Sequence, residues 1–378
     1  MTVSRAPDVI VVGAGLVGTM TALGLAEAGL QVTLIDHDFP GAGSTGAAMG
    51  HIVVMDDTPA QLALCAHSRT RWNALSETLP ADGEHDHCGT LWLATDGDEL
   101  AAATSRVAGY AASGVRAELL DAAALREAEP HLRHDLAGAL SVPDDSVCYP
   151  PAIARDLAQR AAERGAVLRF GAMVTAIEPG GVRLAGNERI AAGAVVVAGG
   201  ATSPQLIPAL PIVPRRGHLV ITDRRPGMVR HQLVELGYLH SAHTFGGASV
   251  AFNVQPRRTG QLLIGSSREL VGFKSGINRR LLAAMLERAG TFVPALREAR
   301  ALRTWTGFRP ATPDKLPLIG AWPAIPGVWI AAGHEGLGIT MAPGTADIVI
   351  AGILGSSSPV DPAPFRPDRP MPTMAEAA

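Results

Sequence analysis

The residues from Val9 to Asp36 constrain the fold more than any other part of the chain. A short apolar run from Val9 to Val12, rich in β-branched side chains, predicts a buried parallel strand. The glycine pattern G-x-G-x-x-G follows, then a helical pattern that stops at Gly29, then a second apolar strand that ends at Asp36. This succession predicts a βαβ unit with a dinucleotide site at its first turn.

The glycines of this pattern each have a physical role. Gly13 permits the tight turn, Gly15 lets a pyrophosphate approach the backbone, and Gly18 lets the helix pack closely on the strand. The N-terminus of the helix offers unpaired N–H groups and a partial positive charge to phosphate. The carboxylate of Asp36 can accept hydrogen bonds from a ribose diol and would repel a 2′-phosphate, which disfavours NADP. NAD and FAD both remain open at this point.

The composition excludes several classes of protein. A chain of 378 residues is long enough for two domains and a large core. The formal net charge of −3 gives no indication of a nucleic-acid partner. Three scattered cysteines without a C-x-x-C spacing predict neither a disulfide framework nor an iron–sulfur cluster. No apolar run reaches the roughly 18 residues of a membrane span, and the first strand begins too early for a signal peptide, so we expect a cytoplasmic protein.

Two loops could bind ligands. In residues 37–51, Ser44 and Thr45 can donate to phosphate, and the small residues from Gly46 to Gly50 leave room for a planar ring; the alternative is a flexible loop that binds nothing. Residues 82–88 crowd together Asp, Glu, His and Cys, but their spacing matches no standard metal site. We interpret this second loop as solvated and expect no metal, with a metal site as the alternative.

The rest of the sequence predicts further helices and strands, among them a second sheet. Helices are predicted over residues 58–79, 153–164 and 277–300, with two short ones over 96–128 and a last one ending near Leu354. Apolar strands at 194–197 and 328–332 each run into a glycine-rich turn, and the first of these turns should face the same dinucleotide as Gly13. Residues 212–270 alternate strands without helical crossovers, which predicts an antiparallel sheet with one face open to a ligand.

Four motifs in this order resemble the D-amino-acid oxidase / glycine oxidase family of FAD-dependent oxidoreductases. They are the opening G-x-G-x-x-G, a central VVVAGGA, a late GFRP followed by PLIG, and a terminal AAGHEGLGIT. Within that family, the stretches PRRGHLVITDR and QLVELGYLHSAH are most similar to FAD-bearing β-subunits of bacterial dehydrogenases, among them D-hydroxyproline dehydrogenase, opine oxidase and hydrogen cyanide synthase. The resemblance covers nearly the whole chain.

The resemblance implies an α/β protein with a Rossmann-like FAD-binding domain and a discontinuous α+β domain that carries an antiparallel sheet and binds the substrate. The expected FAD-binding parts are residues 1–80, 140–210 and 305–378, and the expected substrate-binding parts are residues 81–139 and 211–304. FAD would be bound non-covalently, because the position after Ser44 and Thr45 where relatives place a histidine is small here and no cysteine lies near Arg309.

The resemblance also implies where the cofactor lies. Adenosine and pyrophosphate would be at the first turn, with the backbone at Val174 facing the adenine. A helix N-terminus within Gly333–Thr340 would stabilise the negative charge of the reduced flavin. The residues expected at the cofactor are Gly13, Gly15, Leu16, Val17, Gly18, Asp36, His37, Ser44, Thr45, Ala48, Met49, Gly50, Val174, Ala198, Gly199, Gly200, Arg309, Gly333, Glu335, Gly336, Leu337, Gly338, Ile339 and Thr340.

Arg309 is the first candidate for the substrate site. In similar enzymes the arginine of this GFRP motif binds the substrate carboxylate with two parallel hydrogen bonds; a structural role, such as pairing with Asp314, is the alternative. Asn253 and Arg268 stand where relatives carry other side chains and are expected to line the pocket, with surface positions as the alternative. His51 is included as a catalytic candidate, although a histidine of this kind is more often structural than catalytic. His240 and His243 could also reach the pocket.

Three functions remain open from the sequence. The first is an FAD-dependent dehydrogenase of D-hydroxyproline, a proline-like compound or another D- or secondary amino acid, which passes electrons to a partner or a quinone. The second is a glycine or D-amino-acid oxidase that uses O2. The third is a flavin-binding subunit whose main role is assembly into a hetero-oligomeric complex. The expected partners are a small amino-acid substrate and other subunits, with peripheral membrane association through those subunits as an option.

Overall fold

The computed structural model describes residues 6–55, 57–237 and 247–373, so His240 and His243 lie outside the described residues. Its first layer is a six-stranded sheet, and the opening βαβ unit forms its centre. β1 (Val9–Val12) pairs in parallel with β2 (Val32–Asp36) on one side and with β12 (Ala194–Val197) on the other, and all side chains of β1 are buried. In spatial order the strands are β18 (Leu318–Ala321), β19 (Val328–Ala332), β12 (Ala194–Val197), β1 (Val9–Val12), β2 (Val32–Asp36) and β8 (Val167–Phe170).

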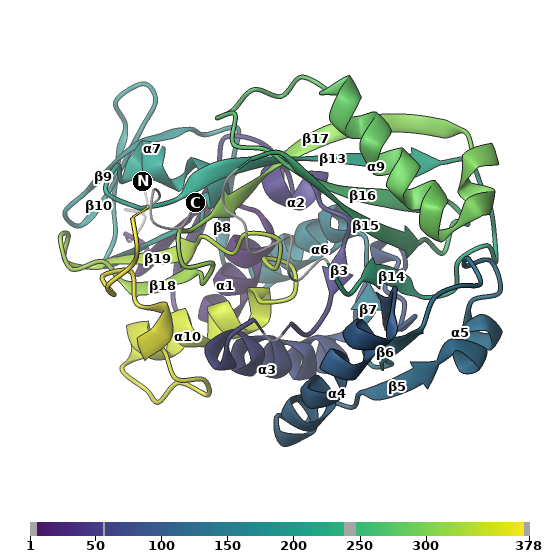
Figure 1. Cartoon of the computed structure of the whole chain (residues 1–378). Coiled ribbons are helices and arrows are strands. Elements are labelled where there is room, and N and C mark those ends of the chain that lie inside the picture. Colours follow the sequence, from purple (N-terminus) through teal and green to yellow (C-terminus); the bar gives the residue numbers. More distant parts are fainter. Residues whose placement is uncertain (1–5, 56, 238–246, 374–378) are drawn as a thin grey trace.

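Helices cover this sheet. α1 (Leu16–Glu27) contacts α6 (Pro150–Glu163) and α10 (Ala342–Leu354), and α10 contacts α3 (Pro59–Ser76) in turn (Figure 1). α1 has buried residues around its whole circumference, because neighbours cover it on every side. A small antiparallel sheet of β9 (Val174–Glu178), β10 (Gly181–Leu184) and β11 (Arg189–Ala191) is separate from the six-stranded sheet.

The second layer is an eight-stranded sheet, with α9 (Arg279–Phe292) packed against it (Figure 1). Phe252 of the sheet stacks on Phe292 of the helix with ring centroids 4.3 Å apart, inside a separate apolar core. Neighbouring strands pair antiparallel except for β14 (Gln232–Glu235) and β4 (Thr90–Ala94), which pair in parallel. The spatial order is β17 (Ala301–Ala311), β13 (Val213–Thr222), β16 (Leu262–Arg268), β15 (Ser249–Pro256), β14 (Gln232–Glu235), β4 (Thr90–Ala94), β6 (Gly138–Val142) and β5 (Glu118–Asp121).

The fold class expected from the sequence is confirmed: a Rossmann-like α/β layer is joined to a second, mainly antiparallel sheet. The domain boundaries remain a proposal; β17 extends across the one placed at residue 305. The remaining short elements are α2 (Gly43–Ala47), β3 (His51–Ile52), β7 (Ser146–Val147), α7 (Ser203–Leu206) and the 3₁₀ turns at 81–83, 200–202, 294–298 and 363–365.

Two expectations about elements were wrong. Residues 96–128 do not form two short helices: α4 (Gly97–Ala112) is long, and β5 precedes the short α5 (Ala122–Ala128). β5 forms because its backbone pairs with β6, which local helix propensity cannot indicate. Residues 37–51 are not a loop throughout, because they contain α2 and β3. Within the described residues, no helix combines the length and hydropathy needed to cross a membrane.

Candidate functional site

A long cavity of about 790 Å³ opens where the carboxyl ends of β1, β2 and β12 meet. Gly13 begins its wall and lies at φ +110°, where a β-carbon would be 2.5 Å from Ala198 O. A β-carbon at Gly18 would be 1.8 Å from Gly13 O, so only glycine allows α1 to approach the strand this closely. Gly15 exposes bare backbone to the cavity at the start of α1. Gly13 and Gly18 therefore have the structural roles that their spacing predicts, and the role of Gly15 in binding a pyrophosphate stays a prediction.

Hydrogen bonds hold the cavity's polar wall in place. Asp36 Oδ2 accepts from Ala14 N at 2.6 Å, and Asp36 Oδ1 accepts from Asp38 N at 2.9 Å, which fixes the carboxylate at the end of β2. Thr45 Oγ1 accepts from Leu16 N at 3.1 Å, so its own hydroxyl proton is available to a ligand. Ser44 differs from expectation, because its hydroxyl donates to Phe308 O at 2.5 Å and joins α2 to β17.

Most residues expected at the cofactor do line this cavity. They are Gly13, Gly15, Leu16, Val17, Asp36, His37, Ser44, Thr45, Ala48, Met49, Gly50, Val174, Ala198, Gly199, Gly200, Arg309, Glu335, Gly336, Gly338 and Ile339. Gly18, Gly333, Leu337 and Thr340 lie outside its wall. Thr340 instead joins two segments: its hydroxyl donates to His51 O at 3.2 Å and accepts from Val53 N at 3.0 Å.

The terminal glycine motif does not contain the start of a helix. α10 begins at Ala342, with a proline in its first turn, and residues 333–340 form a loop that leads to it. Proline is favoured in the first turn of a helix because its ring fixes φ and because it has no N–H group to leave unpaired. The loop residues that line the cavity are His334, Glu335, Gly336, Gly338 and Ile339. The helix N-terminus that was expected within Gly333–Thr340 therefore lies after this segment, at Ala342.

Arg309 lies on β17 beside the long cavity. Its Nη1 donates to Ser267 O at 3.0 Å. A β-carbon at Gly217 would be 2.4 Å from the same nitrogen, so glycine on the neighbouring β13 leaves the space that the guanidinium occupies. Pairing with Asp314 is excluded as its role, because that carboxylate binds Arg369 with distances of 2.7 and 2.9 Å.

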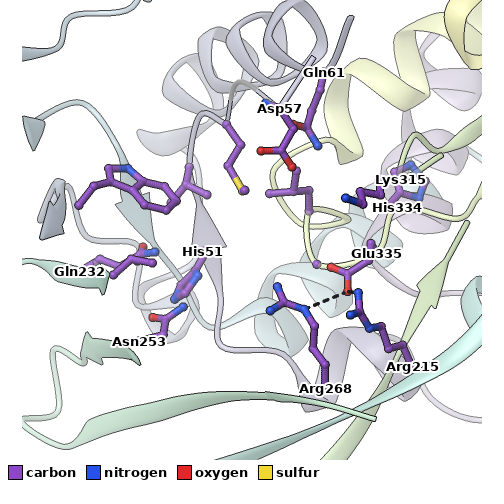
Figure 2. Close-up of a pocket in the computed structure, with 16 residues that line it drawn as sticks. His51, Asp57, Gln61, Arg215, Gln232, Asn253, Arg268, Lys315, His334 and Glu335 are labelled. Carbon is purple, nitrogen blue, oxygen red and sulfur yellow. Dashed lines mark hydrogen bonds and ion pairs between the residues drawn. The ribbon is translucent and has the colours of Figure 1, made fainter. Parts of the chain in front are cut away.

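A second, smaller cavity of about 70 Å³ adjoins the first, and both are lined by His51, Asn253 and Glu335 (Figure 2). Asn253 and Gln232 lie on one side of the small cavity, and Asp57, just before α3, lies with Gln61 of that helix on another. The cationic wall residues are Arg215, Arg268 and Lys315. Arg268 and Asn253 are buried, so the surface positions considered for them are excluded. Leu337 also lines this cavity rather than the long one.

Glu335 is the charged centre of the small cavity. Its Oε1 lies 3.6 Å from Arg215 Nη1 and 3.7 Å from Arg268 Nε (Figure 2). Burial alone would raise the pKa of this carboxyl, but the guanidinium groups of Arg268, Arg309 and Arg215 lower it below its ordinary value. Glu335 is therefore a carboxylate at neutral pH, and it links the small cavity electrostatically to Arg309.

Both histidines of the site are neutral. Burial, and to a smaller extent the nearby charge of Arg309, lower the pKa of His51 to about 3. Burial alone lowers the pKa of His334 to about 3, and its Nε2 lies 2.9 Å from Thr345 Oγ1. His51 Nε2 and Asn253 Oδ1 are buried atoms for which the described structure has no hydrogen-bond partner. Two polar atoms are thus left for a ligand at the junction of the cavities.

Sequence reasoning missed Arg215, Lys315, Asp57 and Gln232 as wall residues. Arg215 stands opposite Arg309 in the pairing of β13 with β17, and no signal in the sequence shows that register. The crowded loop at 82–88 has a structural role: Glu84 binds Arg257 and Asp82 binds Arg155, each at 2.5 Å. Among the described residues, no group of three or more His, Cys, Asp or Glu side chains is placed to hold a metal ion.

Comparison with known proteins agrees with this geometry. Residues 8–351 match the family model DAO, described as FAD dependent oxidoreductase. The chain is 29% identical to the bifunctional protein ThiO/ThiG of a Nostoc species, covering 90% of this chain and only 52% of that protein, so it spans about half the length of this relative. It is 26% identical to hydrogen cyanide synthase subunit HcnC of Pseudomonas aeruginosa, covering 99% of both. The crystal structure of glycine oxidase from Geobacillus kaustophilus superposes with a TM-score of 0.86 at 27% identity, covering 97% of this chain and 99% of that one.

Proposed function

Because the chain belongs to the DAO family of FAD-dependent oxidoreductases, we propose that it oxidises the carbon–nitrogen bond of a small amino acid whose α-carboxylate binds Arg309. The position of Arg309 carries this proposal. Its guanidinium borders the long cavity, and its charge lowers the pKa values of His51 and Glu335, which line both cavities. A planar guanidinium can form two parallel hydrogen bonds with a carboxylate, which fixes the orientation of the substrate.

The residues of the long cavity fit FAD. Bare backbone at Gly13 and Gly15, next to the start of α1, suits a pyrophosphate. The Asp36 carboxylate suits a ribose diol, and the glycine-rich turns after β12 and β19 extend the wall beyond what the first turn alone would need. We infer that the binding is non-covalent, because Gly46, Ala47 and Ala48 after Ser44 and Thr45 have no nucleophilic side chain.

The chemistry that FAD supplies when bound is acceptance of a hydride from the α-carbon, while the nitrogen lone pair forms a C=N bond that water later hydrolyses. The protein's contribution is mainly orientation. Arg309 holds the carboxylate, and Asn253 Oδ1 is available to accept a hydrogen bond from the amine. His51 is too weak a base to deprotonate an ammonium group, so the amine must arrive uncharged. Met49, Leu219 and Leu263 form a small apolar cluster, and the first two of these side chains line the long cavity.

We further propose the electron acceptor and the location. A dehydrogenase of D-hydroxyproline or another proline-like or D-amino acid, delivering electrons to a partner subunit or a quinone, is supported by the similarity to a protein named as a synthase subunit. Such an enzyme would work in the cytoplasm, with membrane association only through its partners. Glycine or D-amino-acid oxidation by O2 is the second candidate, and the full-length similarity to a glycine oxidase favours it. The third candidate function, a flavin-binding subunit of a hetero-oligomeric complex, is compatible with either reaction.

An anaerobic screen of flavin reduction tests the proposal. The purified holoprotein is mixed with glycine, sarcosine, D- and L-amino acids, proline, hydroxyproline and opines, and loss of flavin absorbance is followed by stopped flow. The proposal requires that at least one amino acid reduces the flavin; if only dithionite does so, the proposal fails. Reoxidation of the reduced protein by O2, compared with a soluble quinone, then separates the oxidase from the dehydrogenase. Stoichiometric hydrogen peroxide at a rate that matches turnover would exclude the dehydrogenase.

A further inference from the structure

The charged side chains in the wall of the small cavity interact with one another. Glu335 Oε1 lies 3.6 Å from Arg215 Nη1 and 3.7 Å from Arg268 Nε. Burial lowers the pKa of Lys315, and the opposite charge of Asp57 acts against that lowering. Burying a further charge is costly unless it gains a counter-ion of its own. A ligand group that binds in this cavity is therefore better uncharged.

Three neutral side chains of the same wall differ from the charged ones. Trp92 Nε1, Gln232 Oε1 and Asn253 Oδ1 are buried atoms for which the described structure has no hydrogen-bond partner. Trp92 is 3% exposed, Gln232 1% and Asn253 5%, so bulk water does not solvate these atoms. Leaving a buried donor or acceptor without a partner is costly, and a ligand that bonds to it removes that cost. The neutral part of the wall is therefore where a ligand group would gain most.

The pairing of three strands brings these side chains to one face of the eight-stranded sheet. Val234 of β14 stands opposite Trp92 of β4 on one side and opposite Asn253 of β15 on the other. Gln232 precedes Val234 by two residues on the same strand, so both side chains leave the sheet on the same face. All four residues line the small cavity, and Gln232 and Asn253 are seen on the same side of it (Figure 2). An indole N–H donor and two amide acceptors thus border one space.

The two cavities give these groups an order along a bound substrate. Arg309 lines only the long cavity, Asn253 lines both, and Trp92 and Gln232 line only the small one. A substrate whose α-carboxylate binds Arg309 and whose amine reaches Asn253 therefore extends its far end toward Trp92 and Gln232. The cavity volume of about 70 Å³ accommodates a short arm. Carbon atoms of this arm would contact the apolar residues of the wall, which are Val53, Met55, Val234 and Leu337.

We propose that the substrate carries a hydroxyl group on a short uncharged arm, and that this hydroxyl accepts a hydrogen bond from Trp92 Nε1 and donates one to Gln232 Oε1. The inference rests on the proposed function, because Arg309 and Asn253 set the direction of the arm. A hydroxyl meets both wall groups because its one oxygen accepts and also donates. Hydroxylated prolines, serine and threonine have such an arm. A site that bonds to a substrate hydroxyl discriminates strongly against the analogue without it, because its polar groups are then left without partners.

Matched pairs of compounds test the idea. Serine is compared with 2-aminobutyrate, threonine with valine, and cis- and trans-4-hydroxyproline with proline, each in both configurations at the α-carbon. The members of the first two pairs differ by a hydroxyl in place of a methyl group and hardly in shape. The measured quantity is the rate of anaerobic flavin reduction divided by the apparent dissociation constant. We expect the hydroxyl to improve this ratio by roughly tenfold or more in at least one pair.

A binding measurement keeps the test independent of turnover. The carboxylates 3-hydroxypropionate, 3-hydroxybutyrate and 4-hydroxybutyrate have no nitrogen, so they cannot undergo oxidation of a carbon–nitrogen bond. Each is titrated against the holoprotein, followed by the change in flavin absorbance, and compared with propionate or butyrate. At least one hydroxy acid should bind roughly tenfold more tightly than the acid without the hydroxyl.

Variants locate the effect. Gln232→Leu removes the acceptor at similar volume and should reduce the preference for the hydroxyl to about threefold or less; Trp92→Phe removes the donor and should reduce it in the same direction. The preference is a ratio within one variant, so a general loss of activity cancels. Gln159→Leu, at an exposed position on α6, and Trp322→Phe, outside both cavities, are the matched controls and should keep the full preference. If Trp92→Phe does not fold, Gln232→Leu and the wild-type titrations still decide.

The outcomes are separable. If the compounds without the hydroxyl react and bind as well as their partners, the inference is overturned while the proposed function stands. If the preference is present but survives both substitutions, the hydroxyl binds elsewhere and this assignment is wrong. If no amino acid reduces the flavin, the proposed function fails; a tenfold preference in the titrations then still supports the hydroxyl site, and equal affinities overturn it.

Discussion

Arg309 occupies space that exists only because residue 217 is glycine: a β-carbon there would lie 2.4 Å from Arg309 Nη1. Gly217 lies on β13 and Arg309 on β17, and the two strands pair along their whole length. The bare backbone of one strand therefore sets the position of the guanidinium on the next.

Gly217→Ala should displace the Arg309 guanidinium without touching the nucleotide end of the long cavity. We expect FAD to remain bound and the rate of flavin reduction by substrate to fall roughly tenfold or more, because a small misplacement of an orienting group is costly. Stopped-flow reduction under anaerobic conditions measures this. Gly109→Ala on α4, where a β-carbon meets nothing within 4 Å, is the control. Unchanged reduction in the first variant would show that the position of Arg309 does not matter.

Arg309→Lys keeps the charge and removes the planar pair of donors. The bound flavin should be retained, and substrate reduction should fall by about tenfold or more, because an ammonium group cannot form two parallel hydrogen bonds with a carboxylate. The flavin spectrum verifies retention, and stopped-flow reduction measures the loss. Arg280→Lys serves as the control for an exposed arginine. A lysine variant as fast as the wild type would remove Arg309 from the substrate site.

Gly15→Ala tests the cofactor cradle. The added β-carbon would lie 3.1 Å from Thr45 Oγ1 and would cover backbone that now faces the cavity. We expect the dissociation constant of FAD to rise by roughly tenfold or more. Titration of the apoprotein with FAD, followed by quenching of flavin fluorescence, gives the constant, with Gly109→Ala as control. An unchanged affinity would place the pyrophosphate elsewhere.

The two buried histidines should make the protein acid-sensitive. Their folded pKa values of about 3 lie below the ordinary 6.5, so below pH 6.5 the unfolded chain binds protons that the folded chain does not. The two neutral histidines therefore cost no stability above that pH, and the free energy of unfolding decreases on their account as the pH falls toward 3. At about pH 5, each histidine accounts for a loss of about 2 kcal/mol.

His334→Gln removes one of these contributions. The difference in the free energy of unfolding between about pH 7.5 and pH 5 should shrink by about 2 kcal/mol relative to the wild type. Denaturant titrations at both pH values measure it. Asp145 acts in the opposite direction, because burial raises its pKa to about 7, but it is present in both proteins and cancels. An identical pH dependence in the variant would mean that His334 is already able to ionise in the folded state.

Much of the nucleotide end was predictable because its determinants are consecutive in sequence. The turn from Gly13 to Gly18 and the acid at Asp36 belong to one βαβ unit, and local chemistry fixes their relative positions. The incorrect predictions concern features that depend on contacts between segments far apart in the sequence. β5 exists through its pairing with β6, and the hydroxyl of Ser44 is taken up by Phe308, more than two hundred residues away.

The sequence by itself therefore determined the dinucleotide cradle, the fold class and Arg309 as a candidate, because these depend on short-range patterns of glycine, strand and charge. Only the tertiary structure decided the composition of the small cavity. Asp57, Arg215, Arg268, Lys315 and Glu335 come from five separate segments, and no local pattern links them. They meet at one cavity only because the chain folds these segments around the same space.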